Sequence, residues 1–127
     1  MKVAKRKPRK KKAALSVNDV IIQSIKDKKG ENIVSIDLRN IPDTISDYFI
    51  ICDADNTTQV KAIAEHVMEE TQKRLGEKPW HKEGLREMEW VLIDYVNTVV
   101  HIFHKPTRKF YQLEELWSDG VVERYDD

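Results

Sequence analysis

The spacing of hydrophobic residues changes from segment to segment, and each spacing predicts a different element. Apolar residues recur every three or four positions after Ser16 and again in a clearer stripe after Asn56, which is typical of helices packed on one face. Alternating or continuous apolar runs between and after these segments predict strands. The predicted helices span about 17–28, 57–75 and 107 or 109 to 117, and the predicted strands span 33–38, 48–52, 90–95 and 98–104, with a short extra strand near Trp80.

Capping signals fix the ends of the first two helices. Ser16 with Asp19 resembles a capping box, and Gly30 follows as a stop. Asn56 or Thr57 caps the second helix, which Gly76 ends. The mixed order of helices and strands predicts an α/β fold of the α+β type, in which helices flank a mixed sheet.

The last two predicted strands form a hairpin whose register can be counted. If Val96–Asn97 is a two-residue turn, Tyr95 pairs with Thr98, although valine suits a primed turn poorly. Counting outward gives each strand two faces. One face carries Trp90, Leu92, Asp94, Val99, His101 and Phe103, and the other carries Val91, Ile93, Tyr95, Val100, Ile102 and His104.

The second of these faces is an ordinary core set, but the first is too polar for a core and too aromatic for solvent. We interpret it as a recognition surface in which Asp94 accepts a hydrogen bond from its diagonal neighbour His101. An alternative is a sheet buried on both faces, with Asp94 and His101 paired internally. A three-residue turn would break the parity and scatter these side chains over both faces.

The formal net charge of zero conceals a strong asymmetry. Residues 1–12 hold eight of the 22 basic residues and no acid, so residues 13–127 carry 14 basic and 22 acidic residues, a formal charge of −8. We expect a disordered basic arm at 1–14, a domain at 15–120 and an acidic tail at 121–127. The acidic domain favours a basic protein as its partner. The arm residues expected to contact nucleic-acid phosphates are Lys5, Arg6, Lys7, Arg9, Lys10, Lys11 and Lys12. A solubilising tail or a nuclear-localisation signal is the alternative for the arm.

The remaining composition points to a soluble cytoplasmic protein. No apolar run approaches the length of a membrane span, and no apolar stretch follows the basic N-terminus as in a secretory signal. Cys52 is the only cysteine, which excludes an intrachain disulfide. Because it lies in an apolar run, we expect a buried and inert thiol.

Catalytic signals are weak. Asp53 and Asp55 follow a predicted strand and suggest, as an alternative function, a magnesium-dependent nucleotidyltransferase. His101 and His104 fall on opposite faces of one strand, so no zinc site is predicted. The chain has no P-loop, dinucleotide fingerprint or nucleophile elbow. We therefore predict a binding domain without catalysis, metal or cofactor.

Seven segments form an ordered set along the chain: Asp47–Cys52, Gln59–Ala64, Glu83–Gly84, Trp90–Tyr95, Val99–Phe103, Arg108 and Phe110–Trp117. Together these segments resemble the ribosomal silencing factor family (RsfS, Iojap-like). The resemblance covers about residues 16–120, and its specificity lies in the ordered set rather than in any one segment. The chain departs from the family at residues 53–56, where a small polar set is usual, and at Val96–Asn97–Thr98, where the usual turn contains Gly-Asp.

The resemblance implies a nucleotidyltransferase-like fold without catalysis and binding to the large ribosomal subunit through its fourteenth protein. A bound factor would block joining of the small subunit and repress translation when nutrients are short. Family members often form homodimers. On this basis we expect the ribosomal protein to contact Trp90, Leu92, Asp94, Tyr95, His101, Phe103, Arg108 and Tyr111.

Overall fold

One mixed β-sheet organises the residues that the structure describes. The computed structural model describes residues 16–44, 46–111 and 119–125, without the side chains of 109–111. The strand order in the six-stranded sheet is β3-β4-β5-β2-β1-β6. The elements are α1 (Val17–Asp27), β1 (Glu31–Asp37), β2 (Tyr48–Ala54), α2 (Thr57–Leu75), β3 (His81–Glu83), β4 (Trp90–Asp94), β5 (Thr98–His104), α3 (Lys105–Tyr111) and β6 (Val121–Tyr125).

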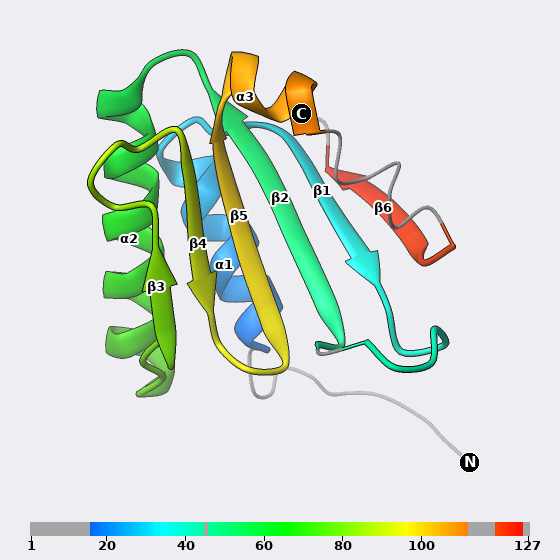
Figure 1. The fold of residues 1–127 in the computed structure, drawn as a ribbon. Coiled ribbons are helices and arrows are strands. Elements are labelled where there is room, and N and C mark those ends of the chain that lie inside the picture. Colours follow the sequence, from blue (N-terminus) through cyan, green and yellow to red (C-terminus); the bar gives the residue numbers. More distant parts are fainter. Residues whose placement is uncertain (1–15, 45, 112–118, 126–127) are drawn as a thin grey trace.

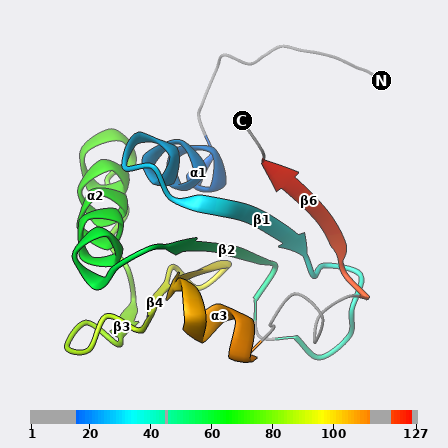
Figure 2. The same ribbon diagram turned by 90° about the horizontal axis from the view of Figure 1, so that it is seen from above.

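The helices cover the two faces of this sheet unequally. Strands β2 and β5 pair in parallel at the centre, and the other pairs are antiparallel. Helices α1 and α2 lie together on one face, and α3 lies on the other side near the ends of β2 and β5 (Figures 1 and 2). The predicted mixed sheet flanked by helices is confirmed. No helix in the described ranges combines the length and apolar character needed to cross a membrane.

Each face of the sheet has its own hydrophobic core. The core under α1 and α2 combines Ile21, Ile25 and Ile63 of the helices with Val91, Ile93, Val100 and Ile102 of the hairpin. The core on the opposite face contains Val34, Ile36, Leu38, Phe49, Ile51, Val99 and Phe103. Because both faces are apolar, β2 and β5 are buried along most of their length, as a central parallel pair requires.

The predicted helix caps are confirmed. The Ser16 hydroxyl accepts from the Asp19 N–H at 3.0 Å, and the Asn56 side-chain oxygen accepts from the Gln59 N–H at 2.9 Å. Gly76 ends α2 in the left-handed conformation, with φ of 68°. At the end of α1 the Gly30 N–H donates to the Ile25 carbonyl at 2.9 Å, and a Cβ at Gly30 would lie 2.4 Å from Ile25 Cγ2.

Two boundaries differ from the sequence predictions. Val121–Tyr125, expected to belong to an acidic tail, forms β6 and pairs with β1 at the sheet edge, so the domain extends beyond residue 120. Helix α3 begins at Lys105, earlier than predicted, because the chain turns into it directly from β5. The predicted continuation to Trp117 lies outside the described residues. The short strand near Trp80 is confirmed as β3.

Candidate docking surface

The hairpin has the register counted from the sequence. Trp90 lies opposite Phe103, Leu92 opposite His101 and Asp94 opposite Val99. The Tyr95 N–H donates to the Thr98 carbonyl at 2.8 Å, which closes a two-residue turn at Val96–Asn97. The assignment of side chains to two faces is therefore confirmed.

The expected exposure of the mixed face is wrong for its β5 half. Phe103 is fully buried and His101 is 4% exposed. The Trp90 ring stacks on Phe103 with centroids 5.1 Å apart, and Phe49 of β2 meets the His101 ring edge-on at 4.7 Å. Because β1 and β2 continue the apolar surface beside β5, these side chains belong to a core. Phe103 and His101 are therefore held inside the domain rather than presented as contact residues.

His101 is a buried neutral imidazole, and its predicted hydrogen bond to Asp94 is wrong. The Trp90 indole N–H donates to His101 Nδ1 at 3.1 Å, which leaves the proton on Nε2. Nε2 is buried without a hydrogen-bond partner among the described residues, and burial lowers the pKa of His101 to about 4. The Asp94 carboxylate instead accepts from the Val96 N–H at 2.7 Å, within the turn.

The depressed pKa of His101 predicts a loss of stability in mild acid. Its unfolded-state pKa is about 6.5, so the unfolded chain binds more protons than the folded chain between pH 6.5 and 4. The free energy of unfolding should fall by about 3 kcal/mol across this window and level off below it. Urea denaturation at several pH values measures the slope. His101→Phe should remove this pH dependence of the unfolding free energy, whatever the overall stability of the variant. An unchanged slope in the variant would contradict its assignment to His101.

The exposed part of the mixed face lies on β4 and the edge strand β3. Trp90, Leu92 and Asp94 are half-buried. The register places His81 of β3 opposite Asp94 and Glu83 opposite Leu92, so these two exposed side chains share this face. We call these five residues the β3–β4 face. It combines an indole ring, an imidazole ring, an apolar side chain and two carboxylates.

The other predicted contact residues lie elsewhere. The Tyr95 hydroxyl bonds to Thr71 of α2 at 2.7 Å, on the opposite side of the sheet, so Tyr95 does not extend the β3–β4 face. Arg108 is 7% exposed and its guanidinium is engaged inside the domain, which corrects its assignment as a surface contact. The side chain of Tyr111 and the whole basic arm, Lys5 to Lys12, lie outside the described residues.

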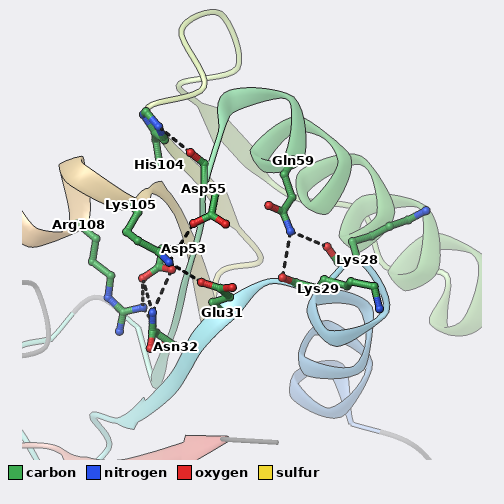
Figure 3. Close-up of polar contacts among 10 residues, drawn as sticks. All are labelled: Lys28, Lys29, Glu31, Asn32, Asp53, Asp55, Gln59, His104, Lys105 and Arg108. Atoms are coloured by element: carbon green, nitrogen blue, oxygen red, sulfur yellow. Dashed lines mark hydrogen bonds and ion pairs between the residues drawn. The ribbon is translucent and has the colours of Figure 1, made fainter.

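Arg108 forms a buried ion pair with Asp53 (Figure 3). Its Nη1 donates to the Asp53 carboxylate at 3.1 Å and to the Asn32 carbonyl at 2.6 Å. The Asn32 amide donates to both Asp53 oxygens at 3.1 Å. Burial nevertheless raises the pKa of Asp53, so the carboxylate depends on these donors to remain charged. The pair ties α3 to β1 and β2.

A second, exposed group of charges surrounds Asp55. Lys105 lies between Glu31 and Asp55, with Nζ 3.0 Å from Asp55 Oδ1, and these carboxylates raise the pKa of Lys105 (Figure 3). His104 contacts the Asp55 carbonyl. Because Asp53 and Asp55 are both engaged by cations, neither presents a free pair of oxygens to Mg²⁺. The described ranges contain no group of three or more His, Cys, Asp or Glu side chains arranged to hold a metal.

Some of these features left no clear signal in the sequence. Asn32 and Asp53 are 21 residues apart, and Asp53 and Arg108 are 55 apart, so their pairing depends on the register of β1 with β2 and on the start of α3. His81 and Glu83 lie in the short strand predicted near Trp80, but their polar side chains gave no signal that they would share a face with Asp94 and Leu92. The buried, inert state predicted for Cys52 is supported: it is fully buried, and burial raises its thiol pKa.

Fold and surface define a small α/β domain with an aromatic and acidic strip at one sheet edge, and comparison with known proteins gives its family. The model of the family described as "Ribosomal silencing factor during starvation" matches residues 11–127. The ribosomal silencing factor of Bacillus subtilis is 35% identical over 111 residues, which cover 87% of this chain and 92% of that protein. The Halalkalibacterium halodurans factor is 39% identical over 99 residues, covering 78% and 83%. The chain belongs to the ribosomal silencing factor family.

Solved structures agree with this assignment. A crystal structure of a Chromobacterium violaceum protein matches with a TM-score of 0.76 and 29% identity, over 80% of this chain and 83% of that one. A Bacillus halodurans crystal structure matches with a TM-score of 0.71 and 36% identity, over 80% and 92%. The described sheet and its flanking helices are therefore the fold of these relatives.

Proposed function

We propose that this protein binds the large ribosomal subunit at its fourteenth protein, blocks joining of the small subunit and represses translation when nutrients are short. The proposal combines family membership with the β3–β4 face. It needs no catalytic step, because a bound domain occludes the joining surface by its volume alone.

The observation that carries the proposal is the composition of the β3–β4 face. Trp90 is half-buried with one ring face stacked on Phe103, so it is a rigid aromatic anchor that loses little entropy on binding. Asp94 and Glu83 add negative charge beside it, in a domain of formal charge −8. Such a surface favours a basic protein and disfavours bare nucleic acid.

Three further parts of the proposal rest on the family resemblance and on charge. The basic arm contacts rRNA phosphates near the docking site, which strengthens binding in a salt-sensitive way. The free protein forms a homodimer, and it acts in the cytoplasm. Deleting residues 1–12 therefore weakens ribosome binding, whereas a general RNA-binding module would lose its binding altogether.

The competing function is a magnesium-dependent nucleotidyltransferase that uses Asp53 and Asp55. A nucleotidyltransferase-like ancestry of the fold remains part of our proposal, but the engaged carboxylates argue against catalysis. A metal at Asp53 would have to displace Arg108 and Asn32 from a buried carboxylate. Metal-dependent nucleotide binding in calorimetry would favour this alternative over ours.

A subunit-joining assay tests the proposed function. Purified protein mixed with large subunits before small subunits are added should reduce the formation of joined ribosomes, followed by light scattering. The inhibition of joining should increase with protein concentration. As a control, small subunits that were preincubated with the protein and then separated from it should join normally. Normal joining at saturating protein would contradict the proposal.

A further inference from the structure

Val96 has a backbone conformation that its side chain disfavours. Its φ is 77°, in the left-handed region where β-branched residues are genuine outliers, and it is 55% exposed. Because more than half of its surface is exposed, packing offsets little of this strain. Strained residues of this kind concentrate at functional sites, where the surrounding structure imposes the conformation.

The surroundings of Val96 impose its conformation through hydrogen bonds on both sides. The Asp94 carboxylate accepts from the Val96 N–H at 2.7 Å, and the Ser46 hydroxyl donates to the Val96 carbonyl at 3.2 Å. The neighbouring Asn97 carbonyl accepts from the backbone N–H groups of Asp47 and Tyr48. The turn is therefore held in a fixed position against the start of β2, and the Val96 side chain projects from a rigid support.

A second exposed apolar residue lies next to this turn. Trp80 is 76% exposed, and its backbone N–H donates to the Asp94 carbonyl at 2.7 Å. His81, opposite Asp94 in the sheet, has its ring centroid 6.0 Å from that of Trp80. Trp80, His81 and Asp94 are therefore neighbours at one end of the β3–β4 face, and Val96 follows two residues after Asp94. We call these four residues the Asp94 corner.

We propose that the Asp94 corner binds a lysine or arginine side chain of the basic ribosomal protein. The aliphatic stem of that side chain lies against Trp80 and Val96, and its charge pairs with Asp94 Oδ2. Oδ1 is occupied by the turn, and none of the described residues donates to Oδ2. Aromatic, aliphatic and carboxylate groups together suit the long apolar stem and cationic end of these side chains. This inference rests on the proposed function and adds contacts by Trp80 and Val96, which lie outside the β3–β4 face.

Val96→Gly separates binding from folding. Glycine adopts a φ of 77° without steric cost, so we expect Tm to rise by about 2–4 °C. Affinity for isolated large subunits should nevertheless fall about 10-fold, because the apolar contact is lost. Trp80→Ala should reduce affinity by about 10- to 100-fold without changing Tm by more than about 2 °C. Val121→Ala, at an equally exposed valine on the opposite sheet edge, is the matched control and should leave affinity unchanged.

The outcomes distinguish this inference from the proposed function. The wild-type protein should bind large subunits more tightly than Val96→Gly and Trp80→Ala do. If both variants bind as tightly as wild type, the Asp94 corner is not a contact, and only this inference fails. If both variants alter dimerisation in sedimentation velocity but not subunit affinity, the corner contacts a second copy and the inference is also overturned. A fall in both Tm and affinity for Val96→Gly would contradict the strained-turn argument. Absence of wild-type binding would overturn the proposed function itself.

Discussion

Arg108→Met is expected to lower the free energy of unfolding by about 3–5 kcal/mol, the cost of breaking a buried ion pair by removing one partner. Asp53 is 2% exposed, and without the guanidinium its carboxylate keeps only the Asn32 amide as a described side-chain donor. The loss combines an uncompensated buried charge with the release of α3 from β1 and β2. Urea denaturation at pH 7 measures it.

The double variant Asp53→Asn/Arg108→Met is the control for this prediction. Replacing both partners removes the orphaned charge, so the double variant should be more stable than Arg108→Met alone. Both variants lose the packing of the arginine side chain. The difference between their free energies of unfolding therefore gives the cost of the unpaired carboxylate. A single Arg108→Met variant within about 1 kcal/mol of wild type would contradict the buried pair.

Asp94→Lys is expected to lower affinity for the large subunit by at least about 30-fold, because reversing an interface charge leaves its partner unpaired or repelled. Asp94 lies at one end of the β3–β4 face, opposite the exposed His81. The substitution also removes the acceptor for the Val96 N–H, so the domain should lose about 1 kcal/mol of stability yet remain folded.

Asp94→Asn separates these two effects. Asparagine keeps a side-chain oxygen for the Val96 N–H but carries no charge, so the turn should remain closed while affinity still falls. We expect its affinity to lie between those of wild type and Asp94→Lys. If folded Asp94→Lys binds large subunits as tightly as wild type, the β3–β4 face is not the docking surface.

The sequence predicted elements whose signals are local. Helix ends followed from Ser16, Asn56 and Gly76, because each supplies a cap within its own turn. The hairpin register followed from turn length and a period of two, and it held even though Val96 must adopt a positive φ. The sequence was sufficient to predict an interaction where the residues that make it are close in the chain.

Features that depend on distant segments were not predicted. The burial of His101 and Phe103 requires β1 and β2 to lie beside β5 with apolar side chains on the same face, which a hairpin count does not contain. The pairing of Val121–Tyr125 with β1 joins residues about 90 apart in sequence, and its polar composition resembled a tail. The burial of Arg108 likewise depends on a partner strand rather than on its own helix. Family resemblance suggested candidate contact residues but not which of them reach the surface.

Co-sedimentation with separated ribosomal subunits tests the central claim most directly. Wild-type protein, Asp94→Lys and the control Val121→Ala are each mixed with isolated large or small subunits and centrifuged through sucrose. We expect wild type and Val121→Ala to sediment with large subunits and Asp94→Lys to remain at the top of the gradient. None of the three proteins should sediment with small subunits. Wild-type protein that sediments with small subunits, or with neither subunit, would contradict this expectation.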